Sequence, residues 1–229
     1  MKFITRYAPL FILPLLVLCG AAPGAIPSGQ WEYRLLANGV QVGRAILSNR
    51  ASNGNYVITS ELRMDMGRIG NISRQIVTET TDFRPVKLES YTTLLNNGKK
   101  QTIDTVAEFN GQTVTVRAGD KTSALTLRGN FVLDGNYFIA SMIGAGFRRG
   151  FETKALIYDP TIELETLIPV TTRVIGMEDV VLGGKTVRLM HITQSIDNVK
   201  SADSYLDEKG VLVRAVIQMM NITIELVRE

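Results

Sequence analysis

The sequence is short of the residues on which most metal and nucleophilic chemistry depends. It holds one cysteine, Cys19, and one histidine, His191, and only 7% of its residues are aromatic. A multi-histidine metal centre and a thiolate zinc site each need several such side chains, so neither is expected. No Walker loop or GxGxxG motif occurs. We therefore expect no cofactor, no metal and no enzymatic activity.

A carboxylate-based hydrolase is the enzymatic alternative that this composition leaves open. Glu163 and Glu165 are two residues apart, and Glu178 and Asp179 are adjacent. Paired carboxyls are the groups that glycoside hydrolysis requires. The same spacings are common on solvated strand faces and turns, and His191 stands in an apolar, strand-like run. We interpret all five side chains as structural.

The chain also has only a small excess of basic over acidic residues. The formal net charge is +3, and no basic run is longer than Lys99-Lys100 or Arg148-Arg149. Nucleic-acid binding depends on a concentrated basic surface that neutralises phosphates. We expect no nucleic-acid partner.

The sequence also lacks an apolar run long enough to cross a membrane as a helix, which takes ~20 residues. Its N-terminal run, Ala8 to Leu18, has 11 residues. Lys2 and Arg6 precede this run and Cys19-Gly20-Ala21 follow it, which is the pattern of a cleavable signal peptide. We predict that residues 1–21 are removed and that residues 22–229 form one domain.

Export without disulfides is typical of a bacterial envelope protein, so we predict a periplasmic location. Two alternatives remain for this segment. One is an uncleaved membrane anchor. The other is lipidation of Cys19, which would anchor the protein but which the large Leu18 just before it disfavours.

Most of the chain alternates polar and apolar residues with a period of two, which predicts β-strands. Tyr56, Ile58, Ser60, Leu62, Met64 and Met66 share one face of such a strand. Asn-Gly pairs at 38–39, 53–54, 97–98 and 110–111 favour the positive-φ turns of hairpins. The pattern predicts a mainly β protein with a curved antiparallel sheet. An outer-membrane barrel is an alternative that the low aromatic content disfavours.

One segment breaks the alternation. Asp134 can cap a helix near 135–148, with an apolar surface and with Arg148 and Arg149 at its end. A helix lying over a curved apolar sheet can enclose a hydrophobic groove. We predict that this groove is lined by Met64, Met66, Phe138, Met142 and Phe147. Methionines adapt to irregular ligands, although the alternative is that they simply fill the core.

Several segments resemble a family of exported bacterial proteins of unknown function. They are Trp31-Glu32-Tyr33-Arg34, Gly39-Val40-Gln41-Val42-Gly43-Arg44-Ala45, Asp82-Phe83-Arg84-Pro85, Phe131-Val132-Leu133-Asp134, Val174-Ile175-Gly176-Met177-Glu178 and Tyr205-Leu206-Asp207-Glu208-Lys209-Gly210-Val211-Leu212-Val213-Arg214. Such families are similar in shape to the lipoprotein-localisation factors (LolA/LolB-like). The resemblance implies a half-open β-barrel around one short central helix.

Together these observations predict a non-enzymatic exported envelope protein that binds or carries an apolar ligand such as a lipid or acyl chain. Its partners would be a lipid or a lipoprotein, or another envelope protein. The alternative function is that of a structural or protein-partner-binding envelope protein. A shared shape alone does not establish a shared function.

Overall fold

The computed structural model describes residues 26–196, 200–219 and 222–229. The predicted signal peptide, with Cys19, lies outside the described residues, so its cleavage stays a prediction. The elements in chain order are β1 (Gly29–Ala37), β2 (Val40–Ser52), β3 (Asn55–Asp65), β4 (Ile69–Thr80), β5 (Pro85–Asn96), β6 (Lys99–Asn110), β7 (Thr113–Ala118), β8 (Lys121–Thr126), β9 (Phe131–Val132), α1 (Asn136–Gly144), β10 (Glu152–Ile157), β11 (Ile168–Leu182), β12 (Lys185–Ile196), β13 (Lys200–Leu206), β14 (Leu212–Met219) and β15 (Ile222–Arg228).

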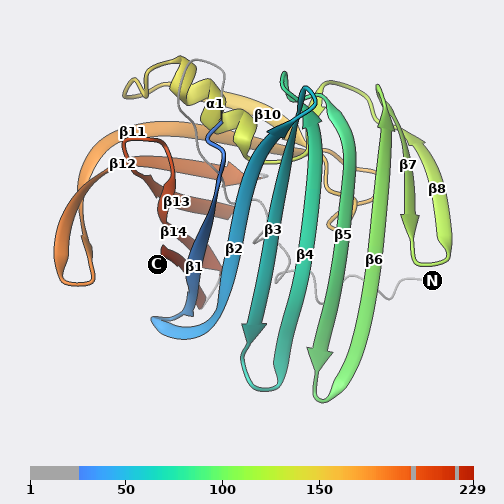
Figure 1. The fold of residues 1–229 in the computed structure, drawn as a ribbon, viewed down its shortest axis with the longest axis horizontal. Coiled ribbons are helices and arrows are strands. Elements are labelled where there is room, and N and C mark those ends of the chain that lie inside the picture. The colour runs from blue at the N-terminus through green and yellow to red at the C-terminus, as the bar shows by residue number, and fades with distance from the viewer. Residues whose placement is uncertain (1–25, 197–199, 220–221) are drawn as a thin grey trace.

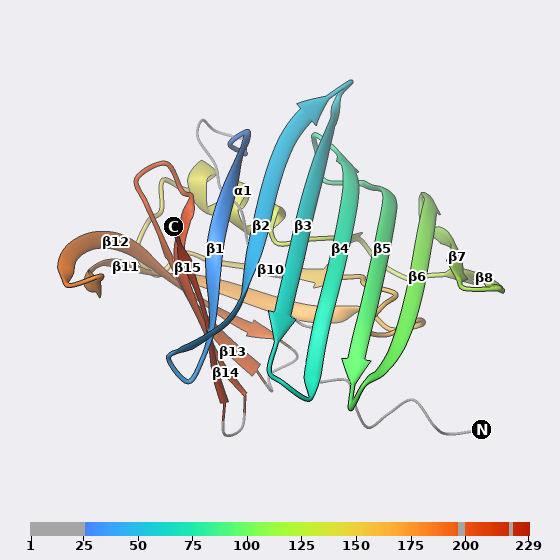
Figure 2. The same ribbon diagram turned by 60° about the horizontal axis from the view of Figure 1, so that its bottom comes forward.

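The described strands form one sheet in the order β8-β7-β6-β5-β4-β3-β2-β1-β15-β14-β13-β12-β11-β10-β9. Neighbouring strands are antiparallel except β9 and β10, which are parallel. The sheet curves so that the long strands β2–β6 stand side by side while β11–β14 cross behind them (Figures 1 and 2). β8 and β9 are the two edges, so the barrel is not closed. The structure confirms the predicted fold class, a mainly β, curved and half-open antiparallel sheet with one short helix.

The hairpins follow from the turn chemistry of the sequence. Asn38, Asn53 and Asn97 have φ values of 48°, 51° and 49°, and the glycines that follow them have φ values of 79°, 75° and 79°. Two successive residues with positive φ make the turn that matches strand twist, and asparagine and glycine adopt it at least cost. These turns join β1 to β2, β2 to β3, and β5 to β6.

The concave side of the sheet is packed with apolar side chains in two main clusters. One joins β1–β3 to β11–β15 and includes Tyr33 and Leu206, both fully buried. The other lies between β3–β8 and the β9–β10 region and includes Leu88 and Tyr158. Helix α1 contributes to both clusters, because Phe138 packs in the first and Ala140 in the second. The core therefore holds the two halves of the curved sheet together around the helix.

Helix α1 lies within the predicted range and is shorter than predicted. It ends at Gly144, after which Gly146 and Phe147 have φ values of 62° and 49° and turn the chain away. Gly144 and Gly146 weaken the last predicted turn, which explains the early end. Asp134 lies one residue before the N-cap, Gly135, and its Oδ1 accepts the N–H of Asn136 at 2.9 Å. Within the described residues, no helix has the length and apolarity needed to span a membrane.

Candidate binding site

The structure brings together four of the five side chains predicted to bind a ligand. Met64, Phe138 and Met142 are buried in the first core cluster, and Phe147 packs against it half-buried. Met66 lies beyond the end of β3, with 38% of its surface exposed. The chain turns there at Gly67, whose N–H donates to Asp65 Oδ1 at 2.8 Å. The space predicted to be a groove is filled by side chains packed around α1. Ligand binding by these residues stays a prediction.

A pair of buried carboxyl groups, which the sequence did not reveal, joins α1 to the sheet. Glu79 in β4 is fully buried, and its Oε1 accepts the N–H of Leu133 at 2.6 Å. Asp134 Oδ2 accepts a hydrogen bond from Asn136 Nδ2 at 2.6 Å. Asn49 Nδ2 in β2 in turn donates to Asn136 Oδ1 at 3.3 Å. These bonds give hydrogen-bond partners to buried polar groups and fix the start of the helix, while Glu79 Oε2 is buried without one among the described residues.

Burial governs the protonation of this pair. Burial raises the pKa of Glu79 well above its ordinary value, and the nearby charge of Asp134 raises it further, against a lowering by the Leu133 N–H. Burial also raises the pKa of Asp134 to about 6, although its two hydrogen bonds from Asn136 act in the opposite direction. Both shifts arise because the charged form loses its hydration. The pair lies inside the core, so we assign it to anchoring the helix.

The polar groups of the core continue along the inner face of the sheet. Gln75, Ser90 and Thr105 lie directly opposite one another on β4, β5 and β6, and all three are buried. Gln75 Nε2 donates to Asp159 Oδ2 at 3.0 Å, and Asp159 Oδ1 accepts the Thr161 N–H. The inner face of β4–β6 next to the segment that follows β10 is therefore partly polar, unlike the uniformly apolar lining expected for a groove that holds an acyl chain.

His191 occupies a polar cluster on the outer face of the C-terminal strands. Its Nε2 lies 2.9 Å from Asp203 Oδ1 and its Nδ1 lies 3.0 Å from Glu178 Oε1. Its ring stacks on Tyr205 with the centroids 4.7 Å apart. The two carboxylates approach opposite nitrogens of the ring, so the three side chains do not converge on one ion. Within the described residues, no group of three or more acidic, histidine or cysteine side chains is placed to bind a metal.

The acidic residues considered for hydrolysis do not face one cleft. Glu163 and Glu165 are exposed in the loop between β10 and β11. Glu178 and Asp179 are successive residues of β11 and point to opposite faces of the sheet. Asp179 Oδ1 lies 3.4 Å from the Arg188 guanidinium. The two pairs therefore lack the shared geometry that paired-carboxylate catalysis requires.

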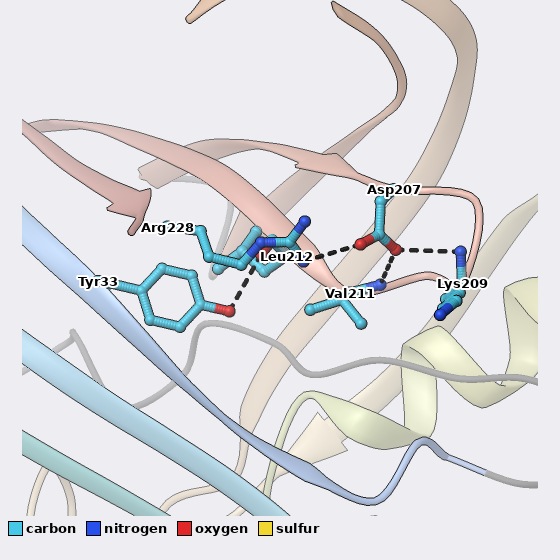
Figure 3. A network of polar contacts seen from close by, with 6 residues as sticks. All are labelled: Tyr33, Asp207, Lys209, Val211, Leu212 and Arg228. Atoms are coloured by element: carbon cyan, nitrogen blue, oxygen red, sulfur yellow. Dashed lines mark hydrogen bonds and ion pairs between the residues drawn. The ribbon is translucent and has the colours of Figure 1, made fainter. Parts of the chain in front are cut away.

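One hollow, of about 550 Å³, is lined by residues of β1, of the turn between β13 and β14, and of the end of β15, with Asp207 among them. Asp207 Oδ1 accepts the N–H groups of Lys209 and Val211, and its Oδ2 lies 2.8 Å from Arg228 (Figure 3). Beside it, the Tyr33 hydroxyl donates to the carbonyl of Leu212 at 3.0 Å. The Asp207 carboxylate is thus occupied in holding the turn and β15 together.

A second hollow, of about 560 Å³, lies on the outer face of β2–β6. Strand register arranges most of its lining into two adjacent cross-strand rows. One row is Arg44, Arg63, Ile72, Thr93 and Thr102, and the other is Ile46, Glu61, Arg74, Tyr91 and Asp104.

The second hollow combines apolar and cationic groups that face solvent. Ile72 and Tyr91 are about two-fifths exposed, and Arg44 and Arg63 are exposed beside them. Arg74 is paired with an acidic neighbour, since its Nε lies 3.2 Å from a Glu61 carboxylate oxygen. This volume is in the range of small-ligand sites. The hollow is therefore the candidate binding site. Sequence reasoning missed it because its members are distant in the chain and only strand register brings them together.

The sequence matches no protein-family model and no curated protein. Solved structures with a similar fold were found. A β-barrel-like protein of domain of unknown function DUF1849 from Brucella abortus aligns with a TM-score of 0.60 and 11% identity, over 87% of this chain and 94% of that one. A DUF1089 family protein from Pseudomonas aeruginosa aligns with a TM-score of 0.41 and 13% identity, over 82% and 89%. At this identity the first likeness concerns the fold alone, and this chain is thus similar in fold to a β-barrel-like protein of unknown function.

Proposed function

We propose that the protein is a non-enzymatic binding protein of the bacterial periplasm whose ligand is an amphiphile such as a lipid. The observation that carries the proposal is the hollow on the outer face of β2–β6. It offers Ile46, Ile72 and Tyr91 as apolar contacts next to the guanidinium groups of Arg44 and Arg63. A few polar groups among apolar side chains are typical of small-molecule sites.

The polar clusters support a role without catalysis. The Glu79–Asp134 pair anchors α1, and Asp207 holds a turn. His191 lies between the carboxylates of Glu178 and Asp203, and its ring stacks on Tyr205. Each cluster thus has a structural use, which fits the proposal of a binding protein.

The N-terminal segment supports the periplasmic location. Lys2 and Arg6, the apolar run and the small residues up to Ala21 predict export and cleavage. The analogy with lipoprotein-localisation factors would place an acyl chain beneath α1. Phe138 and Met142 are fully buried there, so such a site would require the helix to move outward.

Recovery of the bound ligand tests the proposal. The protein would be expressed with its N-terminal segment, purified from the periplasmic fraction without detergent, and measured by native mass spectrometry. We expect a mature chain beginning at Ala22 and an adduct that organic extraction identifies as a lipid. A chain that stays in the cytoplasm would contradict the location. A chain without any adduct that also fails to bind added lipid vesicles or micelles would contradict the function.

Binding of a protein partner is a second candidate function, favoured by the packed core and by strand β8. β8 lies at one end of the strand order, so one of its edges is not covered by a strand of the described residues. An uncovered edge is a template for pairing with an extended segment of another protein. The N–H groups of Thr122 and Ala124 alternate with those that pair with β7 and therefore point to this open edge. Thr122→Pro and Ala124→Pro changes that abolish crosslinking to an envelope protein in cells would support this function.

A further inference from the structure

One cross-strand row on the outer face of the sheet gathers arginine side chains. Arg34 in β1 lies directly opposite Arg44 in β2, and Arg44 lies directly opposite Arg63 in β3. Directly opposite side chains share a face of the sheet and have Cβ atoms about 5 Å apart. The register therefore sets three guanidinium groups side by side over a span of about 10 Å, since neighbouring strands are spaced by just under 5 Å.

Such a row is unfavourable for the protein alone. Like charges directly opposite one another on adjacent strands are destabilising. Elsewhere in the same sheet arginines have acidic partners, as Arg214 has Glu225 at 2.7 Å. Arg34, Arg44 and Arg63 form no ion pair with any residue that the structure describes. Three adjacent exposed cations that form no ion pair within the described part of the chain form a complementary surface for an anion.

The row that contains the three arginines becomes apolar at β4. The row continues from Arg63 to Ile72, which is 42% exposed. On β5, Tyr91 and Leu95 point to the same face and are 40% and 39% exposed. Leu95 packs against the backbone of Gly70, where an added Cβ would come within 3.2 Å of its side chain. The row of three arginines on β1–β3 thus leads into exposed apolar side chains of β4 and β5. Exposed Glu32, Glu61 and Arg74 lie beside it on the same face.

We propose that this surface binds an anionic phospholipid, with its phosphate headgroup on Arg34, Arg44 and Arg63 and its acyl chain directed over Ile72 and Tyr91. The inference rests on the proposed function and names the ligand class and its orientation. A guanidinium group binds phosphate oxygens through two parallel N–H bonds, which favours phosphate over a diffuse negative charge. The hollow in front of Arg44 and Arg63, of about 560 Å³, gives the headgroup a place on the sheet.

Vesicle co-sedimentation tests the inference with phosphatidylglycerol and phosphatidylcholine. The test variant is R34Q/R44Q/R63Q. The matched control is R117Q/R128Q/R148Q, which removes three exposed arginines from other parts of the molecule. We expect the wild type to bind phosphatidylglycerol and the test variant to bind it on the order of 100-fold less, because each basic side chain contributes about fivefold at an anionic lipid surface. The control variant should bind like the wild type.

Soluble glycerol phosphate distinguishes a headgroup site from a lipid site. We expect it to compete only at millimolar concentration, because it lacks the acyl chain that Ile72 and Tyr91 contact. Circular dichroism and thermal unfolding show whether each variant is folded. Equal binding of the wild type to both vesicles, or equal binding by a folded test variant, would overturn the inference and leave the proposed function standing. Failure of the wild type to bind any lipid would overturn both.

Discussion

The buried carboxyl pair predicts an unusual pH dependence of stability. A carboxyl group whose pKa is raised in the folded state holds its proton at pH values where the unfolded chain has lost it. Folding then becomes less favourable as the pH rises from the unfolded pKa to the folded pKa. Asp134 changes from an ordinary value of 3.8 to about 6. That shift corresponds to about 3 kcal/mol of stability lost between pH 4 and pH 6.

The perturbation that tests this reasoning is Glu79→Gln. The glutamine keeps a carbonyl oxygen to accept the Leu133 N–H, which Glu79 binds at 2.6 Å, and it carries no charge. It removes the cost of ionising a fully buried side chain. At pH 8 we expect the free energy of unfolding to rise by more than about 1.4 kcal/mol, the equivalent of one pKa unit. At pH 4.5 we expect a smaller difference.

The assay is urea unfolding of wild type and variant at pH 4.5 and pH 8, followed by far-UV circular dichroism. Glu79→Leu is the control, because it removes the charge and also leaves the Leu133 N–H without an acceptor, at a cost of ~1–3 kcal/mol. It should therefore be less stable than Glu79→Gln at both pH values. The reasoning is refuted if Glu79→Gln is less stable than the wild type at pH 8, or if its gain is larger at pH 4.5 than at pH 8.

Three further predictions concern other parts of the structure. Arg44→Gln removes the central charge of the arginine row, so it should stabilise the protein by about 0.2–1 kcal/mol and weaken phosphatidylglycerol binding. Equal or lower stability of the variant in thermal unfolding at low salt would contradict this. Met142→Ala empties space in the fully packed core and should cost about 2–5 kcal/mol in urea unfolding, so a loss below 1 kcal/mol would indicate a core looser than the structure shows. Asp207→Asn weakens the contact with Arg228 at 2.8 Å and should cost about 1–2 kcal/mol, a loss that should shrink at high salt.

Local features of the sequence account for the positions of the hairpins and for which face of a strand such as β3 is buried. Asn38-Gly39 and Asn53-Gly54 carry the turn chemistry of a tight hairpin in four residues, so no distant contact is needed to predict it. The alternation from Tyr56 to Met64 likewise predicts the buried face of β3. It does not predict where the strand ends, because Met66 continues the pattern while Asp65 and Gly67 form a turn.

The sites depend on contacts between distant residues, which local patterns do not contain. Glu79 lies in a polar segment, from which an exposed strand residue is predicted. In the structure its side chain faces inward and binds the N–H of Leu133, 54 residues further along the chain. Arg34, Arg44 and Arg63 each look like ordinary exposed positions on separate strands. Only the register of β1–β3 shows that they share one row.

The placement of lipid on the outer face is tested most directly by photo-crosslinking. The protein would be exposed to vesicles of phosphatidylglycerol that carry a photoreactive group on the acyl chain, and the labelled residues would be mapped by peptide mass spectrometry. We predict labels on β4 and β5, at or next to Ile72 and Tyr91. Labels confined to the core around Phe138 and Met142 would contradict the account and would place the ligand beneath α1 instead.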